Sequence, residues 1–171
     1  MRALKATILA VIVATPLVSA AGQEPPSSLE PLRHGTVNLS HEANRVTACT
    51  PKVDHQKLSC TATRQAIDST TAVTLKPVAG GDVATKDRRE AQQVSLPKEG
   101  GQLQKLELAV GVWEIDWPGR NERDRFYVAE NDEFAIKLRT DVGSCKKVKD
   151  ECKLKTDQTQ LVVNIPQRCR R

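Results

Sequence analysis

Short segments in which apolar or β-branched residues alternate with polar ones run through most of this chain, and turn residues separate them. The clearest case is residues 103–117, where the alternation continues on both sides of Gly111 and ends at Pro118. A period of two residues is typical of a strand with one buried face. The glycine inside this stretch predicts a bend or bulge at Gly111.

The same pattern predicts further short strands along the chain, and residues 85–93 fit a single short helix or a mobile loop equally well. The additional strands are expected at residues 36–40, 45–50, 57–63, 71–78, 94–96, 126–128, 133–139, 153–155 and 161–165. This series predicts an all-β fold, an antiparallel β-sandwich of immunoglobulin-like or related type with at most one short helix. Residues 106–117, a strand, a glycine-containing turn and a second strand with an early tryptophan, resemble the late hairpin of prealbumin-like sandwich modules.

The first twenty residues have the organisation of a secretory signal peptide. Arg2 and Lys5 precede an apolar run, and small residues follow at positions 18–20, so we expect cleavage before Ala21. A membrane-spanning helix needs about 20 apolar residues, and Pro16 interrupts a shorter run. The sequence therefore predicts a secreted or periplasmic protein without stable membrane insertion after cleavage, with a flexible arm at residues 21–34 and a single β-sandwich domain at residues 35–171.

Five cysteines follow the predicted signal peptide, and they are Cys49, Cys60, Cys145, Cys152 and Cys169. In an exported chain such cysteines predict disulfide bonds. The spacing favours Cys49–Cys60 and Cys145–Cys152, each closing one hairpin, while Cys169 could instead pair with either member of the second set. Loop closure separates these choices by only about 1 kcal/mol, so the partners stay open. An unpaired Cys169 would be available for a disulfide-linked homodimer or a mixed disulfide with a partner.

Redox and metal chemistry find little support in the sequence. There is no C-x-x-C motif, so a thiol-redox protein is an alternative interpretation only. Cys49, His55 and Cys60 are ligand types for zinc, but their spacing is not a usual one. We expect neither a metal nor another cofactor.

Basic residues gather toward the C-terminus. Residues 140–171 hold eight Lys and Arg against four Asp and Glu, a net charge of +4, whereas residues 21–139 carry a net charge of −1. A basic region of this kind can meet an acidic protein, a polyanionic glycan or an anionic membrane surface. Export and the lack of aromatic residues among the basic ones disfavour nucleic acid.

Two charged segments and one aromatic residue are the candidates for a binding surface. They lie in the charged loop at residues 120–125, in the basic hairpin at residues 146–155, and beside Pro118. The candidates are Arg120, Arg123, Arg125, Lys146, Lys147, Lys149 and Trp117. Of the two tryptophans, Trp117 is expected to be the exposed one, because a turn follows it, and an exposed tryptophan can stack on a sugar ring.

No catalytic residue is assigned from the sequence. A G-x-S-x-G motif is absent, and Glu114 and Asp116 have the alternation of an ordinary amphipathic strand. We therefore expect an exported, non-catalytic binding or accessory module with a protein or glycan partner, one form of which is a hydrolase inhibitor. The alternative is an extracellular or periplasmic enzyme that acts on glycans through Glu114 and Asp116.

Overall fold

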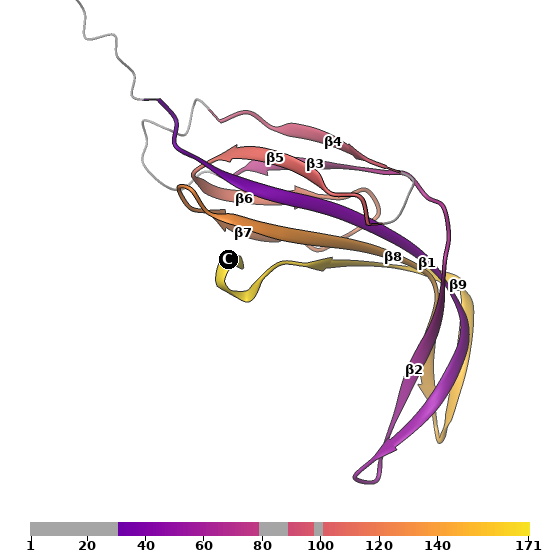
Figure 1. Cartoon of the computed structure of the whole chain (residues 1–171). Coiled ribbons are helices and arrows are strands. Elements are labelled where there is room, and N and C mark those ends of the chain that lie inside the picture. The colour runs from indigo at the N-terminus through magenta and orange to yellow at the C-terminus, as the bar shows by residue number, and fades with distance from the viewer. Residues whose placement is uncertain (1–30, 79–88, 98–100) are drawn as a thin grey trace, which may run out of the picture. The chain divides into compact units, whose positions relative to one another are not determined.

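The computed structural model describes residues 31–78, 89–97 and 101–171, and residues 32–171 form one unit that is almost entirely β-strand (Figure 1). The strands are β1 (His34–Asp54), β2 (Lys57–Ala66), β3 (Thr71–Pro77), β4 (Gln92–Leu96), β5 (Gln104–Ala109), β6 (Gly111–Asp116), β7 (Asp124–Val128), β8 (Glu133–Val148) and β9 (Glu151–Asn164), and a short 3-10 turn follows at Gln167–Cys169. The predicted signal peptide, most of the predicted flexible arm and residues 85–88 of the predicted helix lie outside the described residues. The rest of that helix does not form, because residues 89–91 have no regular structure. Gln92 and Gln93, at the end of that predicted helix, belong to β4.

Two sheets form a sandwich-like all-β fold, as the sequence predicts. One sheet has the order β2-β1-β8-β9, with β5 also paired to β1, and the other has the order β4-β3-β6-β7. The strand pairs are antiparallel except for β1 and β8, which run parallel from Thr36 opposite Glu133 to Arg45 opposite Val142. The expectation of a purely antiparallel fold is therefore wrong at this one pair.

Strand β1 is a single strand of 21 residues, where the sequence predicts two short ones. Its first half pairs with both β5 and β8, and its second half pairs with β2. Val37 and Leu39 in the first half are fully buried, whereas residues 47–54 are mostly exposed. The strand thus leaves the sandwich core and continues beyond it (Figure 1).

The predicted hairpin between β5 and β6 does not form. Strand β5 pairs with β1 in one sheet, and β6 pairs with β3 and β7 in the other, so the chain passes between sheets at Gly111. The predicted bend does fall here, and Gly111 has a φ of 141°. This backbone conformation is strained for any other residue, and a Cβ atom here would lie 2.2 Å from Nη1 of the buried Arg89, whose side chain would have to move.

The core lies between the two sheets and is centred on the aromatic half of the chain. Trp113 and Phe126 from the four-stranded sheet are buried against Phe134 and Ile136 from β8. The indole Nε1 of Trp113 donates a hydrogen bond of 2.9 Å to the carbonyl oxygen of Ala109, which satisfies its polar atom inside the core.

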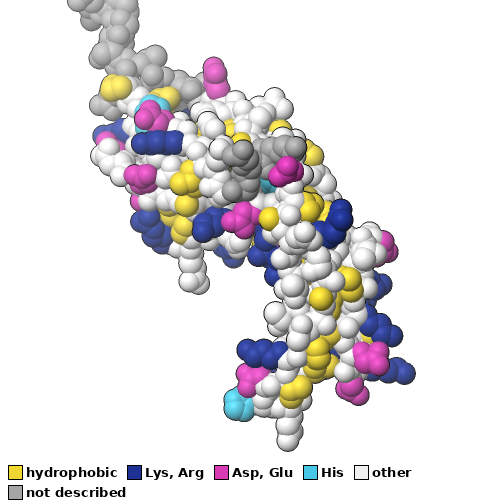
Figure 2. All heavy atoms as spheres, turned by 45° about the vertical axis from the view of Figure 1, so that its right-hand side comes forward, with side chains coloured by type: hydrophobic (Ala, Val, Ile, Leu, Met, Phe, Trp, Pro, Cys, Tyr) yellow, Lys and Arg dark blue, Asp and Glu magenta, His cyan; other side chains and the backbone are white. Residues whose placement is uncertain are grey.

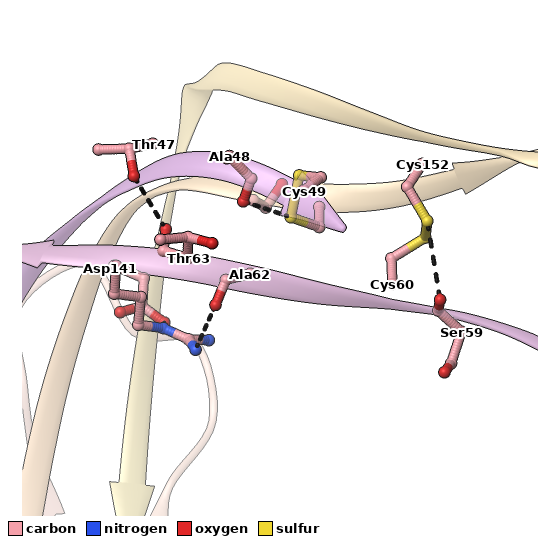
Figure 3. Close-up of a disulfide and its surroundings, with 12 residues drawn as sticks. Thr47, Ala48, Cys49, Ser59, Cys60, Ala62, Thr63, Asp141 and Cys152 are labelled. Carbon is pink, nitrogen blue, oxygen red and sulfur yellow. Dashed lines mark hydrogen bonds and ion pairs between the residues drawn. A yellow bond between two sulfur atoms is a disulfide. The ribbon is translucent and has the colours of Figure 1, made fainter. Parts of the chain in front are cut away.

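The disulfides join the two long hairpins to each other instead of closing either one. They are Cys49–Cys145, from β1 to β8, and Cys60–Cys152, from β2 to β9 (Figure 3). The predicted Cys49–Cys60 and Cys145–Cys152 pairs are therefore wrong.

The strand register explains this pairing. Across the β1–β2 ladder Cys49 lies opposite Ala62 and Cys60 lies opposite Pro51, so the two cysteines are diagonal to each other. Because directly opposed residues share a face of the ladder, and so do residues two apart on one strand, both cysteines are on the face toward the other hairpin.

Candidate binding surfaces

The outer parts of the two hairpins, residues 48–63 and 145–155, form a disulfide arm with almost no hydrophobic core. None of its residues is buried, and its most exposed large apolar side chain is Val53, at 71%. Small exported domains that cannot bury enough apolar surface commonly rely on disulfides. In the disulfide arm the Cys49–Cys145 and Cys60–Cys152 bonds take the place of a core.

The disulfide arm is basic. It carries seven lysines against Asp54, Asp150 and Glu151, a net charge of +4. Lys146 and Lys153 lie directly opposite each other in the β8–β9 ladder, an arrangement of like charges that destabilises a hairpin. Of the arm's lysines, Lys153 has an ion pair among the described residues, at 3.6 Å to Glu151.

The sequence candidates on this hairpin are placed differently from one another. Lys146 and Lys147 are both exposed on β8, but on opposite faces, since Lys147 lies across from Cys152. Lys149 occupies the turn between β8 and β9 with a φ of 54°, in the left-handed region. Figure 2 shows Lys and Arg side chains along one side of the lower part of the molecule, beside a stripe of apolar atoms.

The charged loop at residues 120–125 contains one arginine that is fully engaged inside the protein. The Arg120 side chain is 15% exposed, and its Nε donates a hydrogen bond of 2.6 Å to Asp124. Its other nitrogens donate to Glu122 and to the carbonyl oxygen of Leu161 on β9. The hydrogen bond to Asp124 raises the pKa of Arg120, against a smaller opposing effect of burial. Arg120 therefore joins the two sheets and has little capacity left for a partner.

The two remaining arginines of the loop share one carboxylate. Nε of Arg125 lies 3.1 Å from Glu114, and Nε of Arg123 lies 3.8 Å from the other oxygen of the same side chain. Asp116, two residues further on, pairs with Lys76 on the neighbouring strand. Glu114 and Asp116, the pair considered for glycan hydrolysis, are thus each bound to cations on the outer face of the four-stranded sheet.

The expectation of an exposed Trp117 is wrong. Trp117 is 3% exposed, its Nε1 donates a hydrogen bond of 2.9 Å to Thr71 Oγ1, and its ring meets His41 edge-on with centroids 5.8 Å apart. It closes one end of the core and presents no face on which a sugar could stack.

Cys169 is outside both disulfides and is buried, at 3% exposure, in the turn that follows β9. Burial raises the pKa of its thiol, which lowers its reactivity at neutral pH. A disulfide to another chain through Cys169 stays a prediction, and it requires this turn to open.

A groove of about 310 Å³ lies where the edges of β7 and β9 approach each other, and we call it the arginine groove. The end of the chain contributes to it, because Arg170 forms a β-bridge with Phe126 and the Arg171 N–H donates to the carbonyl oxygen of Arg125 (Figure 1). The groove is lined by Arg120, Glu122, Arg123, Asp124, Arg125, Val163, Ile165, Arg170 and Arg171. The sequence candidates do not include Arg170 or Arg171, although the net charge of the C-terminal region was a signal for them.

The two disulfides indicate an oxidising, extracellular-type environment. Among the helices in the described parts of the chain, none is long and apolar enough to cross a membrane. The same residues hold no cluster of three or more His, Cys, Asp or Glu side chains suited to a metal ion. Comparison of the chain with known protein families, with curated proteins and with solved structures finds no match.

Proposed function

We propose that this protein is an exported, non-catalytic binding module that contacts an acidic protein through its disulfide arm. The observation that carries the proposal is the arm itself, a basic, disulfide-linked pair of hairpins with no buried residue. The absence of aromatic side chains from the arm favours a protein partner over a sugar.

The energetics of the disulfide arm support this proposal. Ordering the backbone costs about 1–2 kcal/mol for each residue, which in a domain core is offset by apolar burial. In the arm that burial is missing, and ladder hydrogen bonds and two long-range disulfides offset the cost instead. A rigid arm that contributes little to the core is understandable when a partner supplies the missing contacts.

Local features of the arm point the same way. The opposed Lys146 and Lys153 are unfavourable for the isolated hairpin and become favourable against carboxylates. His55, Gln56 and Lys149 at the two turns of the arm hold left-handed backbone conformations without being glycine. Strain of this kind is concentrated at functional sites.

The test is retention of a partner by the immobilised protein from the extracellular or periplasmic fraction of the source. Lys146→Glu/Lys149→Glu, which inverts two charges on the arm, should reduce retention at least about tenfold. The matched control is Lys105→Glu/Lys137→Glu, which makes the same change in net charge at exposed positions on β5 and β8 within the sandwich. The retained protein, once purified, should bind the wild type with a salt-dependent association rate.

Equal loss of retention in both variants would make the effect one of net charge and would contradict the proposal. So would turnover of a panel of glycans that disappears in Glu114→Gln, because that result would establish the enzymatic alternative. Hydrolase inhibition is a specific form of the proposal, and it is tested by adding the protein to hydrolases found in the same fraction.

We also propose that the sandwich is of immunoglobulin-like or prealbumin-like type. The support is its two facing sheets with a long first strand at the centre of one of them. Arg123 and Arg125 stay candidates for a second protein contact.

A further inference from the structure

The arginine groove shares no residue with the disulfide arm and has a lining of two kinds. Five arginines line it against Glu122 and Asp124, so the lining has a net charge of +3. Val163 and Ile165, which are 5% and 7% exposed, are the apolar residues of the lining, and we call them the apolar base. The groove therefore combines this small apolar base with an excess of cationic side chains, which we call the cationic rim.

The two acids of the lining do not neutralise this rim. Both Asp124 and Glu122 accept hydrogen bonds from Arg120, whose guanidinium is directed toward β9. Glu114 lies outside the groove lining and is shared by Arg123 and Arg125. The cationic excess is thus carried by Arg123, Arg125 and the two arginines at the end of the chain.

Those two arginines hold no carboxylate among the residues that the structure describes. Arg171 places its guanidinium 5.0 Å from the centre of the Tyr127 ring, a cation–π contact that fixes its position and leaves its N–H groups able to donate. The Arg170 side chain is exposed, and its backbone is held in the bridge to Phe126. Both are therefore positioned by the fold and have free donors.

We propose that the arginine groove binds a carboxylate carried on a small apolar body. The planar guanidinium group binds carboxylates through paired N–H donors. Val163 and Ile165 favour such a ligand over an inorganic anion, because an apolar body can cover the part of these side chains that faces the groove and an inorganic anion has no apolar atoms. The end of a peptide with an aliphatic last residue and a free aliphatic acid share this chemistry.

The experiment is a titration of the full chain, followed by the amide signals of β7 and residues 163–171 in two-dimensional NMR. N-acetyl-leucine should shift these signals and saturate, and N-acetyl-leucinamide, which differs only in lacking the charge, should bind at least about tenfold more weakly. Inorganic phosphate should also bind more weakly, since it cannot cover the apolar base. Hexanoate separates the two sources: binding equal to that of N-acetyl-leucine identifies a free aliphatic acid, and weaker binding identifies a peptide end.

The variants Arg170→Gln and Arg123→Gln should each weaken N-acetyl-leucine binding about tenfold. Arg33→Gln is the matched control, because Arg33 is a 67% exposed arginine paired with Glu130 away from the groove, and it should leave binding unchanged. An unchanged spread of amide signals shows that each variant is folded. The proposal is overturned if the acid and the amide bind equally, if phosphate binds as well as the acid, if nothing saturates, or if the two groove variants bind like the wild type.

Discussion

At the scale of single residues, the buried polar side chains mark the place where β1 leaves the sandwich. Asp141 is 1% exposed and lies near Arg64 and Arg139, each with Nε 3.1 Å from one carboxylate oxygen. Asn44 donates to the other oxygen at 3.4 Å. These four residues come from β1, β2 and β8, so one buried carboxylate joins three neighbouring strands at the base of the disulfide arm.

The buried His41 gives a prediction about how the stability of the protein depends on pH. Burial lowers the pKa of His41 below its ordinary value of 6.5, although a hydrogen bond with the Ser69 backbone and the charge of Glu42 oppose the shift. The unfolded chain then binds a proton at a pH where the folded chain does not. The contribution of His41 to the free energy of unfolding should therefore be fully present above about pH 6.5. At lower pH the free energy of unfolding should decrease, by at most about 1.4 kcal/mol per pH unit.

Urea denaturation between about pH 7.5 and about pH 5.5 measures this slope, in a range where most carboxylates stay ionised. His55→Gln, which removes a histidine whose side chain is 98% exposed, should keep the slope, and His41→Gln should reduce it. A wild-type stability that is constant over this range would contradict the prediction.

At the scale of elements, the turn between β1 and β2 is the clearest case of local strain. Asp54 pairs with Lys57, so the turn consists of His55 and Gln56, with φ values of 45° and 63°. Two-residue hairpin turns with both positions left-handed strongly prefer Asn-Gly. Gln56→Gly should therefore raise the free energy of unfolding by about 1 kcal/mol.

The control for this prediction is Gln65→Gly, the same replacement at an exposed position of β2. There glycine should lower stability by about 0.5–1 kcal/mol. Urea denaturation of both variants checks the pair of signs. Destabilisation by Gln56→Gly would show that the turn, in solution, is not held in this conformation.

The elements show how far local sequence information reaches. Alternation predicts β3 closely, because a half-buried strand imposes its period on the sequence. It predicts only the C-terminal parts of β4 and β7. It also predicts most of β2, although β2 has no buried residue. It divides β1 and β9 into shorter strands, since their outer parts have no core to impose that period. The parallel pairing of β1 with β8 cannot be predicted from local alternation, because the paired residues are about 100 positions apart and the pattern does not identify the partner strand.

For the candidate binding residues too, the sequence predicts what depends on composition and misses what depends on contacts between distant segments. Net charge locates the basic hairpin and the C-terminal arginines, because charge excess is a property of composition. It cannot reveal that Arg120 is used internally, since its acceptor on Leu161 belongs to a strand 41 positions away. Trp117 is misjudged because its partner Thr71 and the ring of His41 also come from distant segments.

At the scale of the whole molecule, the sandwich and the disulfide arm are stabilised by different means. The sandwich is held by its apolar core, and the arm by Cys49–Cys145 and Cys60–Cys152, whose partners are 96 and 92 positions apart. A first closure over such a distance restricts the unfolded chain by about 4–5 kcal/mol. A second closure next to it adds about 3 kcal/mol, since only the short segments between the cysteines remain to be restricted.

The difference between the first and the second closure gives a prediction for the molecule as a whole. Either paired substitution, Cys49→Ser/Cys145→Ser or Cys60→Ser/Cys152→Ser, should lower the free energy of unfolding by about 3 kcal/mol, because the other disulfide still closes the long loop. Removing both should cost more than the sum of the two single losses, since the long-range closure itself is then lost. Urea denaturation under oxidising conditions measures all three variants. A loss in the quadruple variant that is equal to or smaller than the sum of the two single losses would contradict the argument.

Hydrogen exchange adds a spatial check: in the quadruple variant protection should disappear in β2 and persist in β6, because the core around Trp113 does not depend on the disulfide arm.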